Sequence, residues 1–416
     1  FEYINPSMRY QLLFLVLIIG FSCTKTTEPL DPLSQILMDN DSLRQVVENP
    51  AHRVQIIYTQ INRDANNQAT FKSYDYNLDT NTYFYPASTV KLPVALLALE
   101  KLHELNLPGI TANSTLRTGA ATPPQTAVNF DSSSANYLPS IAHYIKKIFL
   151  VSDNDAYNRL YEFLGQEYIN QKLKEKGFTR SRIIHRLSVS GFDTLGNRLT
   201  NPIQLLNDSE VVYQQAEQYG NAYPRWNLDE QIQGKAYTTN DGDLIKAPFD
   251  FTYKNYMSLL DLHDIIQSVM LPEAVSSSQR FQLRPDDYKF LYEYMSKLPR
   301  ESDYPAYPDL ADWDDYVKFL LFGSSKTRIP ENIRVYNKVG DAYGYLTDAA
   351  YIVDDKNKVE FLLAATIHVN ENETFNDGVY EYDRIGFPFL GQLGEAIYQY
   401  ELSRERAYQA NFDHLH

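Results

Sequence analysis

Cysteine is almost absent from this sequence of 416 residues, which contains only Cys23. A single cysteine forms no internal disulfide, and a metal site built from several thiolates is excluded. The chain also lacks a glycine-rich phosphate loop, a dinucleotide fingerprint, a His-Glu-x-x-His zinc helix and a Gly-x-Ser-x-Gly elbow. We therefore expect neither a metal ion nor a cofactor.

Positive charge is also in short supply. The sequence has 38 lysines and arginines against 53 aspartates and glutamates, so its net charge is −15. Such a chain repels phosphate backbones and anionic lipid headgroups, and no nucleic-acid partner is expected. The hydrophobic content of 44% is enough to bury a large core, which argues against disorder across the chain.

Long hydrophobic runs are missing as well, because none approaches the roughly 18 residues that a membrane-spanning helix needs. The one notable apolar run, residues 12–21, follows Met8 and Arg9 and has the length of a signal-peptide core. It leads into residues 20–23, which resemble the lipobox of bacterial lipoproteins. In that motif the cysteine is acylated and becomes the mature N-terminus.

We therefore predict a signal peptide over residues 1–23, lipid attachment at Cys23 and a polar tether over residues 24–33. The alternative is a buried N-terminal helix with an incidental cysteine. The lipoprotein prediction implies an exported protein, periplasmic or at the cell surface, with membrane attachment through its N-terminal lipid.

Hydrophobic periodicity predicts strands near both ends of the chain and helices in the middle. This order implies one sheet assembled from distant segments, with a helical lobe inserted between them. The segment 197–253 shows no clear periodicity. The predicted helices are 32–47, 88–105, two within 141–176, 259–270, 286–298 and 390–404, and the predicted strands are 54–61, 70–76, 334–338, 349–353 and 360–368.

A serine and a lysine share one face at the start of the long predicted helix. Ser88 and Lys91 are three residues apart, which at 3.6 residues per turn brings an amine within reach of the hydroxyl. A serine needs such a base to attack a carbonyl, and burial lowers the pKa of a lysine enough for that task. The alternative is that Ser88 caps the helix while Lys91 extends to solvent.

Two further motifs follow along the chain. Ser-Asp-Asn at 152–154 precedes an apolar helical stretch, and Lys-Val-Gly at 338–340 lies on a β-rich segment. With Ser88 and Lys91, this order resembles the signature set of class A β-lactamases and penicillin-binding proteins. The resemblance extends from about residue 34 to residue 401. Taken alone, the second motif also suits a helix cap and the third a surface charge.

The resemblance implies an α/β (α+β) fold in which an antiparallel sheet is flanked by helices and an all-helical lobe is inserted. Residues 34–81 and 254–405 would form the α/β lobe. Residues 82–253 would form the helical lobe, in which 197–253 is a long insertion-like segment.

The resemblance also implies a role for each motif residue, in a reaction that passes through an acyl-serine. Ser88 would attack the acyl carbonyl, Lys91 would take its proton, and Ser152 would hand a proton to the leaving nitrogen. Four further residues would bind the substrate. Asn154 would orient the substrate amide, and Lys338 would attract a carboxylate. Gly340 would let the substrate backbone approach the strand, and the Asp341 N–H would form an oxyanion hole with the N–H of Ser88.

Two departures from the family pattern concern activity. Val339 stands where the family has a threonine or serine, so one hydroxyl contact to a substrate carboxylate is lost. Class A enzymes also carry a glutamate that activates the deacylating water, whereas residues 182–190 contain no carboxylate and Ser188 falls at the corresponding place. His185 and Asp193 are the nearby alternatives for a base, and a structural role is expected for each.

Three functions remain open on these residues. The first is a serine hydrolase acting on a β-lactam or a related cell-wall peptide amide or ester. The second is a lipoprotein that binds penicillin or peptidoglycan with impaired deacylation. The third is a surface protein that keeps the fold for interaction alone, in which case Ser88 is unreactive.

Overall fold

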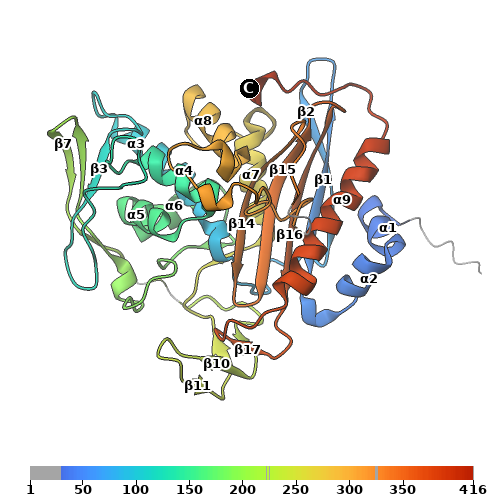
Figure 1. Cartoon of the computed structure of the whole chain (residues 1–416), viewed down its shortest axis with the longest axis horizontal. Coiled ribbons are helices and arrows are strands. Elements are labelled where there is room, and N and C mark those ends of the chain that lie inside the picture. Colours follow the sequence, from blue (N-terminus) through green and yellow to red (C-terminus); the bar gives the residue numbers. More distant parts are fainter. Residues whose placement is uncertain (1–29, 222, 224, 324–326, 416) are drawn as a thin grey trace, which may run out of the picture.

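The computed structural model describes residues 30–221, 223, 225–323 and 327–415, and Figure 1 shows their arrangement. The predicted signal peptide, its Cys23 and most of the predicted tether lie outside the described residues. Within the described part, no helix has the length and apolar character that crossing a membrane requires.

A five-stranded antiparallel sheet forms the centre of the protein, in the order β14-β15-β16-β1-β2. Its bounds are β1 Gln55–Arg63, β2 Ala69–Tyr76, β14 Ile333–Ala342, β15 Tyr345–Asp354 and β16 Val359–His368. β1 pairs with β16, with Ile57 opposite Ala364, so the two ends of the chain meet in the middle of the sheet. The strands predicted from both ends therefore form one sheet, as expected.

Helices cover both faces of this sheet (Figure 1). Alternate residues of a strand point to opposite faces, so Ile56 joins one core and Ile57 the other. Burial on both faces explains why β15 and β16 are buried along their whole length. One face packs against α1 Pro32–Asp39, α2 Asp41–Val47 and α9 Phe387–Ser403, and the other against α7 Leu259–Met270 and α8 Pro285–Ser296.

The single helix predicted over 32–47 is two helices. Asn40 between them is extended, and its side chain accepts hydrogen bonds from the backbone N–H groups of Ser42 and Leu43. An asparagine that caps the second helix in this way ends the first. The first begins at Pro32, where Asp31 caps it, so the predicted tether is also too long by two residues.

The inserted lobe is built around four helices, α3 Lys91–Leu105, α4 Ile141–Val151, α5 Asn154–Leu164 and α6 Gln166–Glu175. The long predicted helix starts at Lys91, after a 3₁₀ turn over Ala87–Val90. The two helices predicted within 141–176 are three, because Ser152 and Gly165 take positive φ angles that interrupt the helical path.

The lobe is not all-helical as predicted, although the fold class as a whole is confirmed. β3 Thr115–Thr118, β6 Ile203–Asn207 and β7 Glu210–Gln215 form a sheet at its outer edge (Figure 1). Strands this short give too few alternations to be recognised in a polar segment. The others are β4 Ser181–Arg182, β5 Leu199–Thr200, β8 Gln218–Tyr219, β9 Ile232–Gln233, β10 Ala236–Thr238, β11 Leu244–Ile245, β12 Phe249–Asp250, β13 Tyr256–Met257 and β17 Thr374–Phe375.

Candidate active site

Ser88 lies in the 3₁₀ turn that leads into α3, at the junction between the lobe and the sheet. The turn is fixed from within, because the Thr89 hydroxyl donates a 2.7 Å hydrogen bond to the Pro86 carbonyl. Ala87 has a φ of 47°, a left-handed conformation that is costly for a residue with a Cβ and is seen where structure dictates geometry. Ser88 is half-buried, and its hydroxyl makes no hydrogen bond within the described part of the chain.

The alternative of Ser88 as a helix cap is wrong. The 3₁₀ turn and α3 both begin without a side-chain cap, and their N-cap residues are Pro86 and Val90. The Ser88 hydroxyl is instead free at the wall of a cavity.

Lys91 is completely buried, so the alternative of a solvent-directed lysine is also wrong. Its Nζ donates to the backbone carbonyl of Ser152, to the Ser152 hydroxyl at 3.2 Å and to the Asn154 side-chain oxygen at 2.7 Å. Burial, followed by the nearby charge of Lys338, lowers the pKa of Lys91 well below the usual lysine value. The first and second motifs are thus joined directly.

Ser152 and Asp153 have cap roles as well as positions at the site. Ser152 ends α4 in a left-handed conformation with φ 56°, and Asp153 caps α5 by accepting from the Ala156 N–H. The two residues therefore do have the cap roles that the alternative gives them. Those roles do not explain why the Ser152 hydroxyl contacts Lys91. That hydroxyl accepts a second hydrogen bond, of 2.8 Å, from Lys338.

Lys338 is 2% exposed on β14, which contradicts the alternative of a surface charge. Its Nζ donates to the Ser152 hydroxyl and to the Val339 carbonyl, both at 2.8 Å. Burial lowers the pKa of Lys338 to about 7, against the opposing charges of Asp341 and Asp348. The third motif thus meets the second, and the Ser152 hydroxyl lies between two lysines.

A buried polar network behind β14 was not found from the sequence. Asn337 donates to the Asp348 carboxylate at 2.8 Å and accepts from Lys318 at 2.7 Å. Asp348 also accepts from the backbone N–H groups of Phe319 and Leu320. The network ties the loop before β14 to the strand next to Lys338. No sequence motif marks these residues, and the only signal available was a polar residue within an apolar strand, Asn337 in β14 and Asp348 in β15.

Gly340 has a packing role that the sequence did not reveal. A Cβ at this position would lie 2.6 Å from the Pro86 carbonyl, 2.8 Å from the Ser88 nitrogen and 2.9 Å from the Thr89 nitrogen. All three atoms belong to the backbone and cannot move aside as a flexible side chain can. Gly340 therefore lets β14 pack directly against the turn that carries Ser88, and its role toward a substrate backbone stays a prediction.

Asp341 follows at the edge of the sheet, and its exposed side chain lines the cavity. The turn between β14 and β15 has two residues, Tyr343 and Gly344, and both have positive φ. In a hairpin of this kind, the pair that flanks the turn, here Ala342 and Tyr345, exchanges backbone hydrogen bonds. Because hydrogen-bonded and non-hydrogen-bonded pairs alternate, the next pair, Asp341 and Leu346, is not hydrogen-bonded, and the Asp341 N–H faces away from β15. Although the side chain reaches solvent in the cavity, the surrounding protein partly desolvates the carboxyl and raises the pKa of Asp341, opposed by the charges of Lys338 and Lys91.

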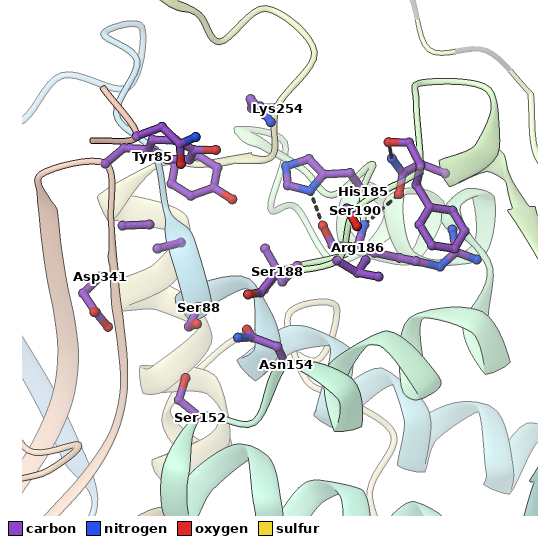
Figure 2. Close-up of a pocket in the computed structure, with 18 of the residues that line it drawn as sticks. Tyr85, Ser88, Ser152, Asn154, His185, Arg186, Ser188, Ser190, Lys254 and Asp341 are labelled. Carbon is purple, nitrogen blue, oxygen red and sulfur yellow. Dashed lines mark hydrogen bonds between the residues drawn. The ribbon is translucent and has the colours of Figure 1, made fainter. Parts of the chain in front are cut away.

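A cavity of about 1230 Å³ opens over these residues. Figure 2 shows Ser88, Ser152 and Asn154 together on one side, with Asp341 across from them. Within the described residues, no group of three histidines, cysteines or carboxylates is placed to hold a metal ion. The walls are completed by residues 184–194, by the segment that contains Asp250, Tyr253 and Lys254, and by Tyr85, Trp313, Tyr316, Tyr343 and Tyr380.

The wall over 184–194 is held rigidly by side chains of α5. Asn158 exchanges two hydrogen bonds with the Leu187 backbone, and Arg186 forms a 3.0 Å ion pair with Glu162. Ser188 then projects at the cavity with a φ of 49° and an exposed side chain. The place where a deacylating carboxylate is expected therefore follows directly on an anchored residue, Leu187, and carries only a hydroxyl.

The two alternative bases have structural partners. The Nδ1 of His185 is hydrogen-bonded to the Arg186 carbonyl, and burial, followed by the charge of Lys254, lowers the pKa of His185 to about 3. Asp193 accepts from the Gly196 N–H at 2.7 Å. Both residues line the cavity, and both contacts fit the structural roles expected for them.

Comparison with known proteins finds one family whose model matches part of the chain. Residues 40–222 match the model of a family described as the Beta-lactamase enzyme family. That stretch contains Ser88, Lys91 and the motif at 152–154, whereas the motif at 338–340 lies beyond it. The match supports a β-lactamase-like protein. No curated protein sequence matches this chain.

Several solved structures are similar to most of the chain. A β-lactamase from Sphaerobacter thermophilus DSM 20745 is 13% identical, with a TM-score of 0.46, and the match covers 89% of this chain and 96% of that one. A β-lactamase from Xanthomonas campestris pv. campestris str. ATCC 33913 is 14% identical, with a TM-score of 0.47 and coverage of 88% and 96%. A protein described as PBP-A is 17% identical, with a TM-score of 0.47 and coverage of 90% and 98%.

Proposed function

We propose that this protein is a serine acyl-transfer enzyme of the β-lactamase and penicillin-binding type, with Ser88 as nucleophile. The observation that carries the proposal is the hydroxyl of Ser152 held between Lys91 and Lys338, beside a serine whose own hydroxyl is free. Three motifs separated by about 60 and 190 residues converge there. A purely structural cluster has no need for two buried lysines on one hydroxyl.

The arrangement supplies a base for the attack. A neutral Lys91 has two N–H donors, which satisfy the Ser152 carbonyl and the Asn154 side chain, and its lone pair then faces the Ser152 hydroxyl 3.2 Å away. That lone pair takes the proton of Ser88, directly or through the Ser152 hydroxyl. Lys338, which stays a donor to the same hydroxyl, favours this direction of transfer.

The developing oxyanion is stabilised at the junction of turn and strand. The N–H groups of Ser88 and Asp341 are brought together because Gly340 allows the strand to pack against the turn. Ser152 then delivers a proton to the leaving nitrogen. The products of this first step are an acyl-Ser88 ester and a released or ring-opened amine.

Slow hydrolysis of that ester is the second part of the proposal. The cavity wall presents Ser188 where a water-activating carboxylate is expected, and His185 stays neutral with its Nδ1 occupied. A penicillin-binding role with long-lived acyl-enzyme is therefore favoured over efficient β-lactam hydrolysis. The substrates we propose are β-lactams and related cell-wall peptide amides or esters.

The test is intact-mass measurement of the purified protein mixed with a penicillin, with the Ser88→Ala variant as control. The expected result is an adduct that depends on Ser88 and persists. A short-lived adduct with drug consumption would assign efficient hydrolysis and a different base. Absence of any adduct would remove the acyl-transfer proposal and favour an interaction-only role.

The location of the protein is a separate proposal, which rests on residues 1–33 of the sequence. We propose export and acylation at Cys23, with attachment to a bacterial membrane. Expression with a labelled fatty acid, beside a Cys23→Ser variant, tests this. Equal labelling of both chains, or of neither, would contradict it.

A further inference from the structure

Lys254 is a cation of the cavity wall that the proposed reaction does not use. It follows β12 at the end of the long segment 197–253 and contributes to the lining of the cavity. Figure 2 shows it above His185, on the far side of the labelled group from Ser152. It therefore lies at the end of the cavity away from Lys338.

The loop of Lys254 is fixed to the opposite wall. The Lys254 N–H donates to the Phe251 carbonyl at 2.9 Å, which closes a turn. The next residue, Asn255, is fully buried, and its side-chain oxygen accepts from the N–H groups of Ile184 and His185 at 2.7 and 3.1 Å. The backbones of Lys254 and His185 are thus tied together through Asn255, so the Lys254 side chain extends from a loop that is anchored to this wall of the cavity.

No carboxylate of the described chain forms an ion pair with the Lys254 ammonium. Its contacts are with aromatic faces, at 5.7 Å from the centre of the Phe249 ring and 5.9 Å from that of Tyr343. Asp250, the acid nearest in sequence, accepts instead from the Thr252 N–H at 2.8 Å. Partial burial lowers the pKa of Lys254. A half-buried cation without a counter-ion is incompletely stabilised, and an anionic ligand group supplies what is missing.

The neighbouring wall suits an elongated organic substituent. Tyr85 stacks on His185 with ring centres 6.2 Å apart and packs edge-on against Tyr343 at 5.1 Å. His185 is neutral, so it does not oppose a charge beside Lys254. The cavity of about 1230 Å³ exceeds the 300–1,000 Å³ typical of small-ligand sites, which leaves room beyond a single bicyclic β-lactam.

We propose that this end of the cavity is a subsite for the acyl side chain of the substrate, and that Lys254 binds a carboxylate at the far end of that side chain. The inference rests on the proposed function, which assigns the acyl carbonyl to Ser88 and the leaving-group side to Lys338. It names the substrate class: acyl donors that carry an anionic arm remote from the bond that is broken.

The test uses two penicillins of equal side-chain length, the hexanoyl and adipoyl derivatives of 6-aminopenicillanic acid. They differ only in a terminal carboxylate. Calorimetric binding is measured on the Ser88→Ala protein, with and without Lys254→Met, and with Lys246→Met as a matched control, since Lys246 is exposed on the same segment and does not line the cavity. Acylation rates of the protein with Ser88 intact are measured in parallel.

The expected result is adipoyl binding tighter by about tenfold, which corresponds to about 1.4 kcal/mol. Lys254→Met should abolish this preference without changing hexanoyl binding, and Lys246→Met should preserve it. Equal binding of the two compounds, binding of neither, or a preference that survives Lys254→Met would each overturn the subsite. A preference in binding without acylation of Ser88 would overturn the proposed function while leaving the subsite intact.

Discussion

The Lys338 ammonium donates a 2.8 Å hydrogen bond to the hydroxyl of Ser152, although the two residues are separated by 186 positions in the sequence. This bond connects the edge of the central sheet to the turn between α4 and α5. It also orients a hydroxyl that Lys91 contacts from the other side. The site is therefore one connected unit, and its parts can be tested singly.

Replacement of Ser152 by Ala should slow acylation of Ser88 by about 10²–10⁴-fold, the usual contribution of a positioned proton donor. The rate of adduct formation with a penicillin, followed by intact mass, measures this. Ser190→Ala is the matched control, because Ser190 is an exposed serine of the same cavity wall. An unchanged rate in Ser152→Ala would show that the hydroxyl takes no part in proton transfer.

The dependence of acylation on pH should differ between substrates with and without a carboxylate. Lys338, with a pKa of about 7, is charged below that pH and neutral above it. Attraction of a carboxylate is therefore lost as pH rises through 7, whereas a penicillin methyl ester has no such attraction to lose. The ratio of acylation rates, acid over ester, should fall between pH 6 and 8. A Lys338→Met variant should show a flat ratio.

Gly340→Ala should destabilise the protein by roughly 1–3 kcal/mol, as forced overpacking does, and should also slow acylation. The reason is the approach of its Cβ to within 2.6–2.9 Å of backbone atoms in the Ser88 turn. Urea unfolding and adduct formation measure the two effects. Gly220→Ala is the control, since a Cβ there has only ordinary contacts from 3.6 Å. Equal stability of the two variants would contradict the packing argument.

Ser188→Glu should shorten the lifetime of the acyl-enzyme by at least about tenfold, because it places a carboxylate where the wall now has a hydroxyl. The decay of the penicillin adduct after removal of free drug measures this. Ser190→Glu adds the same charge two residues away and should leave the lifetime unchanged. If both variants deacylate at the original rate, the missing carboxylate is not what limits turnover.

Asp341→Asn should accelerate acylation by penicillins that carry a carboxylate, by about three- to tenfold, and should leave their methyl esters unaffected. The Asp341 side chain lines the cavity near the Lys338 charge that would bind this carboxylate. Removal of its negative charge removes repulsion. An equal increase for acid and ester would indicate a change in the oxyanion hole instead.

The fold was largely predictable because its strands are apolar and end in recognisable turns. The pattern of β16, for example, gave the strand at 360–368 that the structure extends by one residue. The break at Asn40 and the short strands of 197–253 were not predictable, because capping by one side chain and pairing of two or three residues leave no periodic signal. Tertiary contacts decide both.

The site was predictable only as a list of residues, not as a geometry. The order of the motifs brought Ser88, Lys91 and Ser152 into one hypothesis. The structure places Ser88 and Ser152 at one cavity, with Lys91 buried behind it and within hydrogen-bond distance of Ser152. The sequence did not reveal that Gly340 packs against the Ser88 turn, nor that Lys254 faces the same space. Both facts depend on which distant backbones meet, and no local pattern encodes that.

The central sheet also has a consequence for the growing chain. β1 finds its partner β16 only after the residues between Arg63 and Val359 have been made. At roughly 5–20 residues per second, those ~300 residues take about 15–60 s. During that interval the first hairpin has an open edge. Because β14 and its Lys338 arrive with the same late segment, a nascent or prematurely ended chain contains Ser88 but cannot yet act on a substrate.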